Sequence, residues 1–240
     1  MVILSPRLQA VLDFCRVVEQ GSRPGNQLIH TPLCGVLADI GTDHAYLPIA
    51  AIEQKICKSA IACDLHPGPL KIAKENISKA GFASHIQTRL GDGLKPISPG
   101  EADCIVITGM GGMRIWGILM DGMEQAQLAK RLVLQPQHDI VLLRKNLHKA
   151  GFEIQDERLV REKVGGKELF YIVIAARYTA ANITWTEREY FLGKHLIEAG
   201  GEIFTAYKKR EREKIALYEW QIREPTDINE FRNRLEWLTD

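Results

Sequence analysis

One stretch decides the fold: Gly35-Val36-Leu37-Ala38-Asp39-Ile40-Gly41, a short apolar run that closes with an aspartate and a glycine. Its length and its unbroken apolar character predict a buried β-strand, and the final glycine predicts a tight turn. A helix is expected next, from Tyr46 to Gln54. Pro48 fits the first turn of that helix, because the N–H group that proline lacks has no helical partner there.

The alternation of strand and helix continues along the chain. Further strands are expected over residues 59–64, 86–90, 103–108 and 131–135, with helices over residues 67–80, 114–123 and 140–150. Strands that are apolar throughout are covered on both faces, so the pattern predicts an α/β protein with a doubly wound, mostly parallel sheet. Two more extended runs, 152–160 and 169–177, flank Gly165-Gly166 and predict an antiparallel hairpin that ends the sheet.

Two segments outside this alternation are expected to be helical. The first runs from Leu4 to Glu19, and a polar loop from Gln20 to Cys34 follows it. The second begins at residue 184 and lacks proline up to residue 222, which predicts one long helix; Pro225-Thr226-Asp227 ends it before a shorter helix over 228–238. We therefore expect a Rossmann-like domain over residues 1–181 and a helical, coiled-coil-like extension over residues 182–240.

Composition and charge exclude several classes of protein. No stretch approaches the roughly 18 apolar residues of a membrane span, and the N-terminus lacks the order of a secretion signal. The five cysteines show neither disulfide nor zinc spacing, so we expect reduced thiols and no metal site. The net charge is only +1, so any nucleic-acid contact must come from a local patch. A cytoplasmic protein without a membrane partner is expected.

Three aspartates lie where the first three strands are expected to end: Asp39, Asp64 and Asp92. Ligands of an open α/β sheet bind beyond the carboxyl ends of the strands, so these carboxylates are expected to share one site. Asp64 follows Asp39 by 25 residues, close to the spacing at which an acid accepts hydrogen bonds from ribose hydroxyls. The alternative for each aspartate is a carboxylate that only caps a turn or a helix. Three acids at equivalent strand ends make that alternative less favourable.

The turn after the first strand distinguishes two classes of cofactor. A dinucleotide binder needs Gly-x-Gly-x-x-Gly for the approach of pyrophosphate, whereas Gly41-Thr42-Asp43-His44-Ala45-Tyr46 has one glycine and an added acid. Asp43 would repel a diphosphate but suits S-adenosylmethionine, which carries a positive sulfonium and amine and no phosphate. The turn therefore favours S-adenosylmethionine over a nicotinamide cofactor.

A second glycine-rich segment, Thr108-Gly109-Met110-Gly111-Gly112, follows the strand expected over 103–108. Its glycines leave room for a flat substrate to approach the backbone. The alternative is a glycine-rich turn between strand and helix that binds no ligand.

Together these motifs resemble the bacterial tRNA (adenine-22-N1)-methyltransferase family. The resemblance is carried by Leu4–Leu8, Ala38–Ile49, Arg89–Leu94, Gly109–Gly112 and Leu134–Pro136. It implies the class I methyltransferase fold, S-adenosylmethionine as cofactor and tRNA as substrate. It also implies that the glycine segment replaces the Asn/Asp-Pro-Pro-Tyr motif of amino-group methyltransferases. That replacement fits attack by a ring nitrogen, which already offers a lone pair and needs orientation more than deprotonation.

The resemblance and the strand-end pattern together define the expected site. Predicted cofactor contacts are Asp39, Ile40, Gly41, His44, Asp64, Leu65, Gly91, Asp92, Gly93 and Gly109. Predicted residues around the reacting base are Asp43, His44, Gly109, Met110, Gly111 and Gly112. His44 has two roles open to it, a base or a contact beside the adenine.

Several alternatives stay open at the level of sequence. Arg7 and Arg144 are either phosphate ligands or ion-paired arginines, and the basic run Lys208-Lys209-Arg210 is either a solvated helix face or a tRNA contact. The chain as a whole is expected to methylate adenine N1 in tRNA. The rival functions are a binding module that holds cofactor or RNA without catalysis, and a methyltransferase with another substrate.

Overall fold

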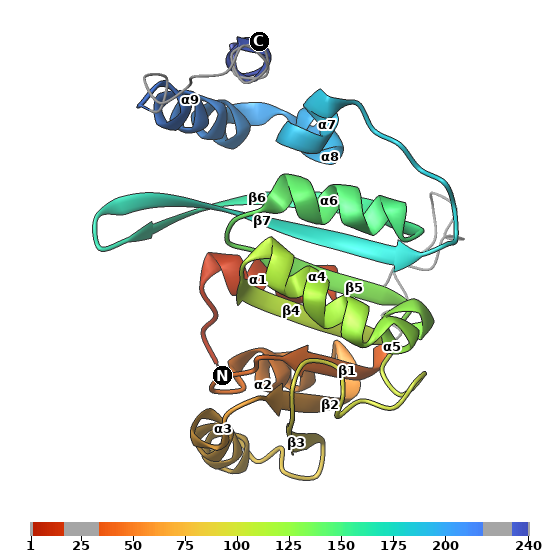
Figure 1. Ribbon diagram of the computed structural model, residues 1–240. Coiled ribbons are helices and arrows are strands. Elements are labelled where there is room, and N and C mark those ends of the chain that lie inside the picture. The colour runs from red at the N-terminus through yellow and green to blue at the C-terminus, as the bar shows by residue number, and fades with distance from the viewer. Residues whose placement is uncertain (1, 17–33, 218–231, 240) are drawn as a thin grey trace, which may run out of the picture.

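Seven strands form one sheet in the order β3-β2-β1-β4-β5-β7-β6. The computed structural model describes residues 2–16, 34–217 and 232–239. The strands are β1 (Cys34–Ile40), β2 (Cys57–Asp64), β3 (Ile86–Leu90), β4 (Cys104–Met110), β5 (Arg131–Pro136), β6 (Phe152–Val164) and β7 (Lys167–Tyr178). Figure 1 shows them stacked from β3 at the bottom to β6 and β7 near the top.

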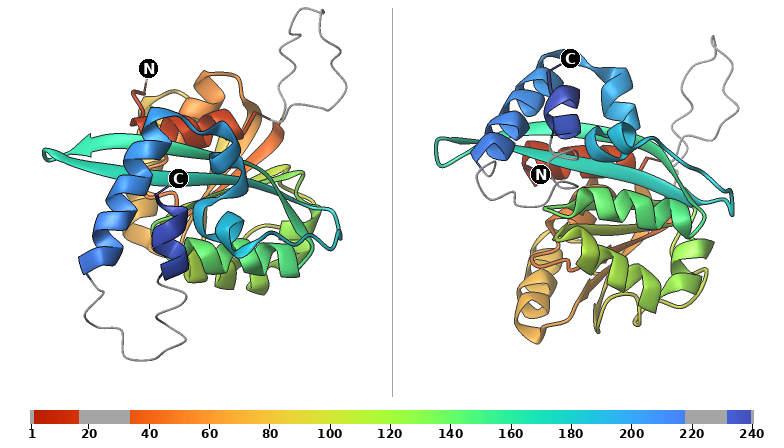
Figure 2. Two further views of the ribbon diagram at one scale, coloured as in Figure 1. Left: turned by 90° about the horizontal axis from the view of Figure 1, so that it is seen from above. Right: turned by 45° about the horizontal axis from the view of Figure 1, so that its top comes forward.

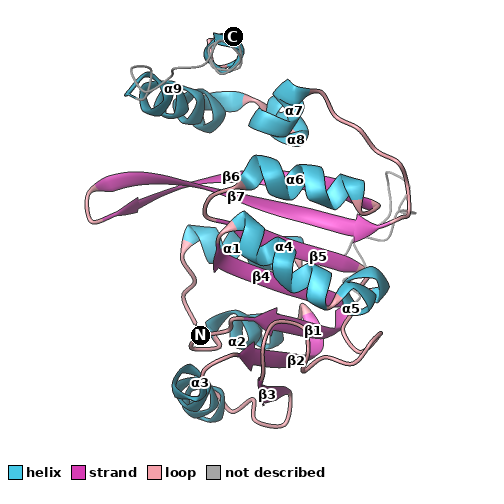
Figure 3. Ribbon diagram, in the orientation of Figure 1, coloured by secondary structure: helices cyan, strands magenta, loops and turns pink. Residues whose placement is uncertain are grey.

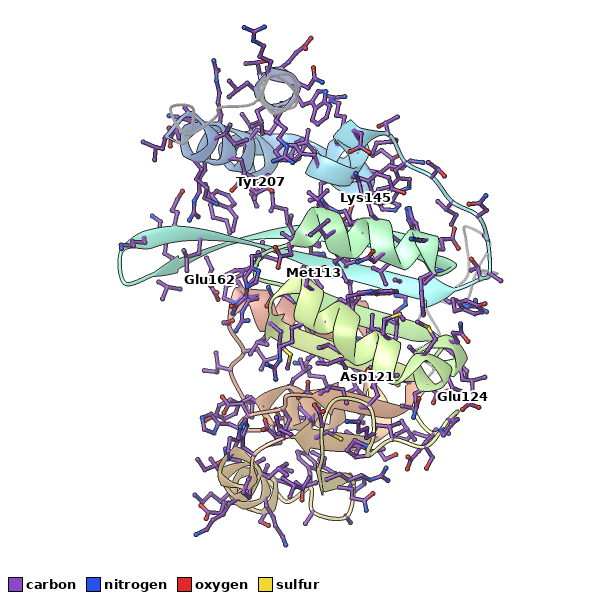
Figure 4. All side chains as sticks on the ribbon, viewed as in Figure 1. Met113, Asp121, Glu124, Lys145, Glu162 and Tyr207 are labelled. Atoms are coloured by element: carbon purple, nitrogen blue, oxygen red, sulfur yellow. The ribbon has the colours of Figure 1, made fainter. Side chains whose placement is uncertain are left out.

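The sheet is parallel from β3 to β5 and antiparallel at β7 and β6, which confirms the expected fold class. The hairpin strands are longer than expected. The pairing of β5 with β7 ends at Leu134 and Ile174, whereas β6 and β7 stay paired as far as Val164 and Lys167. A free two-stranded ribbon therefore extends past the carboxyl edge of the sheet, and Figure 4 labels Glu162 on it. The residues of this ribbon are mostly exposed and include many charged ones, so a pattern of apolar strands does not predict it.

Helices cover both faces of the sheet because successive strand residues point to opposite sides. Along β4, Ile105 and Ile107 belong to one buried cluster and Val106 to the other. The helices on the Val106 side are α1 (Pro6–Phe14), α2 (Tyr46–Glu53) and α3 (Pro67–Lys79). Those on the other side are α4 (Gly112–Asp121), α5 (Met123–Leu128) and α6 (Ile140–Lys149). Figure 3 shows this layering, and no described helix has the length and apolar character to cross a bilayer.

Two helices differ from their expected limits. The first ends at Phe14 and turns at residues 15–16, so the expected end at Glu19 is wrong in the described part and residues 17–19 lie outside it. The helix expected over 114–123 begins at Gly112 and ends at Asp121, and α5 follows it. Of the expected loop from Gln20 to Cys34, only Cys34 is described, as the first residue of β1.

The single long helix expected over residues 184–222 is wrong. Three shorter helices occupy the described part: α7 (Glu187–Leu192), α8 (Lys194–Ala199) and α9 (Gly201–Leu217). Gly193 at φ 94° separates α7 from α8, and Gly200 at φ 56° separates α8 from α9, whose first residue, Gly201, also has a positive φ of 88°; the interior of a right-handed helix has negative φ values. Residues 218–222, the turn at Pro225 and the start of the last expected helix lie outside the described residues; residues 232–237 are helical.

The described helices of the extension pack on the sheet. Contacts join α8 and α9 to β6, and Leu196, Phe204 and Leu238 belong to the same buried cluster as α6. Figure 2 shows α7, α8 and α9 lying over β6 and β7. The described residues give no support for a coiled coil, because these side chains are buried against the sheet domain. The expected boundary at residue 181 stays a prediction.

A buried ion pair lies under this extension. Nε of Arg144 on α6 donates to Oε1 of Glu157 on β6 at 2.7 Å, and both side chains are 0% exposed. Nη1 of Arg144 also donates to the carbonyl oxygens of Tyr190 and Phe191 on α7. Arg144 is therefore ion-paired rather than a phosphate ligand. A β-carbon on Gly193 would lie 2.6 Å from Arg144 and from Glu157, so the chain can pass there only as glycine.

We expect the variant Arg144→Met to lose about 3–5 kcal/mol of unfolding free energy, because it leaves the Glu157 carboxylate buried without its partner. The matched control is Lys145→Met, the next residue of α6, whose ion pair with Glu187 is exposed and worth at most about 1 kcal/mol. Figure 4 labels Lys145 between α6 and α7. Urea unfolding measures both variants. Equal losses for the two would contradict the assignment, and Arg144→Met combined with Glu157→Leu should recover most of the stability.

Candidate active site

A cavity of about 460 Å³ opens at the carboxyl edge of the sheet. Its walls come from the ends of β1, β2 and β4, from the turn after β3 and from the start of α4. The lining residues are Ile40, Gly41, Cys63, Asp64, Leu65, His66, Gly91, Asp92, Gly93, Thr108, Gly109, Met110, Gly111, Arg114 and Ile118. Ten of these were predicted as site residues, and four predicted residues, Asp39, Asp43, His44 and Gly112, lie outside the lining.

The turn after β1 is fixed by one carbonyl group. The N–H groups of Gly41 and Thr42 both donate to the carbonyl oxygen of Cys63 on β2, each at 2.9 Å. Gly41, Asp43 and Ala45 have φ values of 76°, 53° and 59°. The left-handed backbone is costly for the two residues other than glycine, and such strain is maintained only where surrounding contacts impose it. The hydrogen bonds to Cys63 supply that constraint at the cavity.

Asp39 stabilises the turn after β1 through a hydrogen bond with Thr42. It is 3% exposed, and one of its carboxylate oxygens accepts a hydrogen bond from the Thr42 hydroxyl at 2.7 Å. Burial raises the pKa of Asp39 to about 6; the Thr42 hydroxyl opposes that rise, and the charge of Asp64 adds to it. Asp39 therefore positions the turn through Thr42 and does not line the cavity itself.

Asp64 points into the cavity from the end of β2, and its side chain is 11% exposed. One carboxylate oxygen accepts the N–H of His66 at 2.9 Å and the other accepts the N–H of Asp43 at 3.2 Å. These two bonds hold the carboxylate in place and leave each oxygen able to accept one more. A pair of vicinal hydroxyls would complete that set.

The turn after β3 closes the neighbouring wall. The N–H of Gly91 donates to the carbonyl oxygen of Asp64, so this turn is tied to the end of β2. Asp92 is half exposed, and it pairs with Lys95 at 3.1 Å. Gly93 has a φ of 57°, and a β-carbon there would press on Ile118 of α4. The turn thus places Asp92 at the rim of the cavity.

The glycine segment 109–112 forms the opposite wall. The pairing of β4 with β5 is irregular between Thr108 and Met110, where Gly109 has a φ of 74°. The Met110 side chain lies over Gly41, because a β-carbon on Gly41 would overlap its methyl group. Gly112 approaches the loop after β5, with its N–H donating to the carbonyl oxygen of His138 at 2.8 Å. Gly112 is therefore a packing residue of the wall.

Gln135 on β5 holds the start of this wall. It is fully buried, and its side-chain oxygen accepts the N–H of Gly109 at 3.2 Å and Nη1 of Arg7 at 2.8 Å. Its side-chain nitrogen donates to the carbonyl oxygen of Pro136. Gln135 and Arg7 are separated by 128 residues, so only the fold brings them to Gly109.

Asp43 and His44 lie beside the cavity. The side chains are 68% and 36% exposed, and Nε2 of His44 is 3.5 Å from a carboxylate oxygen of Asp43. Nδ1 of His44 is buried without a hydrogen-bond partner in the structure. The Asp43 side chain does not cap α2, whose first residue follows Ala45 without a side-chain cap. The predicted roles of both residues in binding the base stay predictions.

Five lining residues were not predicted: Cys63, His66, Thr108, Arg114 and Ile118. Cys63 and His66 flank the predicted Asp64-Leu65 pair, and Thr108 precedes Gly109. Arg114 and Ile118 lie four residues apart on α4 and so share one helix face. Both lie in the helix expected over 114–123, but the sequence did not show which face of that helix meets the cavity.

The lining combines two carboxylates and the Arg114 guanidinium with several glycines and apolar residues. It suits a ligand that carries hydroxyls and positive charge better than one that carries a diphosphate, because the turn after β1 offers Asp43 where a dinucleotide binder has glycine. Among the described residues, no three metal-ligating side chains gather in one place.

Comparison with known proteins assigns a family to this site. The model of the TrmK family, tRNA (adenine(22)-N(1))-methyltransferase, matches residues 37–238. The tRNA (adenine(22)-N(1))-methyltransferase of Bacillus subtilis (strain 168) is 33% identical over 238 residues, 99% of this chain and 93% of that protein.

Several solved structures match along almost the whole chain, including one from B. subtilis and one from Streptococcus pneumoniae. The B. subtilis m1A22 tRNA methyltransferase TrmK is 32% identical with a TM-score of 0.79, over 100% of this chain and 98% of that chain. Streptococcus pneumoniae Sp1610 in complex with S-adenosyl-L-methionine is 28% identical with a TM-score of 0.81, over 99% and 98% of the two chains. The chain with this cavity at its sheet edge therefore belongs to the tRNA (adenine(22)-N(1))-methyltransferase family.

Proposed function

We propose that this protein transfers the methyl group of S-adenosylmethionine to N1 of an adenine in tRNA, at the position for which its family is named. The observation that carries the proposal is the cavity, in which the hydroxyl-binding geometry of Asp64 faces the glycine segment 109–112. Family membership supports the reaction, and the S-adenosyl-L-methionine complex of Sp1610, a relative of the same fold, supports the cofactor.

The residues of the cavity fit that cofactor. Asp64 would accept hydrogen bonds from the ribose hydroxyls, since both its oxygens keep acceptor capacity. Leu65 is 44% exposed next to it and offers an apolar surface for the adenine ring of the cofactor, with Asp92 at the rim. The backbone of the turn at Gly41 would contact the amino-acid part of S-adenosylmethionine.

Methyl transfer to a ring nitrogen requires that the nitrogen lone pair, the methyl carbon and the sulfur lie in line. When bound, S-adenosylmethionine supplies a methyl carbon activated by its sulfonium; the N1 lone pair of the target adenine forms the C–N bond while the C–S bond breaks and its electrons pass to sulfur. N1 carries no proton, so the step needs no general base, and His44 need not act as one. The product adenine is cationic, and the Asp43 carboxylate beside the cavity would stabilise it.

The target adenine must leave its stack to reach the cavity, so we propose that an extruded nucleotide enters between Asp43 and the glycine segment. The rest of the tRNA needs a separate surface, since the net charge is only +1. The run Lys208-Lys209-Arg210 on α9 fits this role: Arg210 donates to the carbonyl oxygen of Glu168 on the free ribbon, and Lys209 is exposed. A tRNA substrate also supports a cytoplasmic location.

Incubation with labelled S-adenosylmethionine and unmodified tRNA should yield 1-methyladenosine, identified after digestion to nucleosides. The proposal predicts transfer to tRNA and none to free adenosine, because adenosine lacks the phosphate backbone that the tRNA-binding surface would hold. A different methylated nucleoside would show another substrate. Cofactor binding without any transfer would show a binding module.

The variant Asp64→Ala should weaken S-adenosylmethionine binding by about 1–3 kcal/mol, because ribose hydroxyls would lose a buried acceptor. Calorimetry measures it, and NAD should not bind to the wild-type protein. Asp121→Ala is the matched control, an exposed aspartate of α4 outside the cavity, labelled in Figure 4. Unchanged affinity in Asp64→Ala would remove Asp64 from the cofactor site.

The variant Gly111→Val should abolish methyl transfer while S-adenosylmethionine affinity stays within about tenfold. Gly111 has a φ of −64°, and the three atoms nearest to its β-carbon would all belong to the ring of His138, which is 69% exposed and pairs with the neighbouring Asp139. The added side chain therefore narrows the cavity beside the glycine segment without straining the backbone. Gly117→Val on α4 is the control, because its β-carbon meets no atom within 4 Å. An active Gly111→Val enzyme would place the reaction centre elsewhere.

A further inference from the structure

Arg7 occupies an unusual place beside the glycine segment. It lies in the first turn of α1, where a cation is disfavoured by the helix dipole. Its guanidinium donates to Gln135 at 2.8 Å, and its central carbon lies 5.2 Å from the centre of the Tyr171 ring. A β-carbon on Gly109 would lie 3.8 Å from Nη1 of Arg7. Two long-range contacts thus hold a cation at the glycine segment.

Arg7 differs in its partners from three other arginines around the sheet. Arg89, Arg144 and Arg158 each have a carboxylate within 3 Å: those of Glu101, Glu157 and Asp13. No carboxylate of the described residues pairs with Arg7, and only one of its five N–H groups donates to a described residue. Its charge is therefore held in position but not neutralised.

The position of Arg7 points toward the substrate side. Arg7 does not line the cofactor cavity, although Gly109, its neighbour, does. Tyr171 pairs with Val160 near the point where the free ribbon leaves the sheet. Figure 1 shows the start of α1 and the free ribbon at the same edge of the sheet. A polyanion that reaches the glycine segment from outside would pass this guanidinium.

We propose that Arg7 binds a backbone phosphate of the tRNA next to the extruded adenine. A guanidinium with four free donors matches the geometry of a phosphate group, and stacking on Tyr171 leaves those donors in one plane. Gln135 links the two events, since the same side-chain oxygen holds Arg7 and the N–H of Gly109. The inference rests on the proposed function, because it assigns a substrate contact to the same site.

The test is tRNA binding by Arg7→Gln, Arg7→Lys and wild type, in the presence of S-adenosylhomocysteine so that no transfer occurs. Arg7→Gln should raise the tRNA Kd about tenfold at about 0.15 M salt, the loss of one charge-assisted contact. The slope of log K against log salt should fall by about one. Arg7→Lys keeps the charge, so it should keep the slope and lose only part of the affinity.

The control is Arg177→Gln, at the opposite end of β7 from Tyr171, which should bind tRNA as wild type does. Wild-type Kd and slope in Arg7→Gln would overturn the proposal. A lower kcat at unchanged tRNA Kd would instead make Arg7 a positioning residue for Gly109, and weaker S-adenosylmethionine binding alone would assign it to the cofactor carboxylate; both outcomes overturn it. If Arg7→Gln does not fold, a slope of log K against log salt that falls by about one in Arg7→Lys overturns the proposal. Absence of 1-methyladenosine with wild type would contradict the proposed function itself.

Discussion

The carbonyl oxygen of Cys63 accepts hydrogen bonds from two successive N–H groups, those of Gly41 and Thr42, and the cavity depends on this junction. These two hydrogen bonds tie the turn after β1 to the end of β2, where Asp64 lines the cavity. The left-handed residues Asp43 and Ala45 keep their costly backbone only because both ends of the turn are held. Thr42 then donates its hydroxyl to Asp39, so the buried acid supports the turn, and its predicted contact with the cofactor stays a prediction.

The opposite wall is held from β5 in a corresponding way. Gln135 binds the N–H of Gly109, and the carbonyl oxygen of His138 binds the N–H of Gly112, so both ends of the glycine segment are fixed by the strand and loop that follow. Rigid walls suit a reaction whose main requirement is alignment of a lone pair with a methyl carbon. The same Gln135 oxygen reaches Arg7, which joins the N-terminal helix to the site.

The C-terminal extension contributes to stability as well as to any binding of substrate. Its helices α7 and α8 cover the Arg144–Glu157 pair, and Arg144 donates to two carbonyl groups of α7. Burial beneath the same helices lowers the pKa of His148 to about 4, so this histidine is neutral where it contacts Trp185 and Tyr190. Removal of residues 182–240 would therefore uncover a buried charge, and a truncated protein would test stability together with tRNA binding.

The sequence by itself determined the parallel sheet and its closing hairpin, because buried strands are apolar and the carboxyl ends of parallel strands share one edge. The ten predicted residues that line the cavity came from this strand-end pattern together with the family resemblance of the motifs. The tertiary structure alone decided which acids face the cavity: Asp64 points in, whereas Asp39 is covered by Thr42. It also decided the breaks at Gly193 and Gly200, since helical composition does not reveal where packing on β6 forces the backbone to a positive φ. Arg7 meets Gln135 and Gly109 from more than 100 residues away, and local patterns carry no information about such contacts.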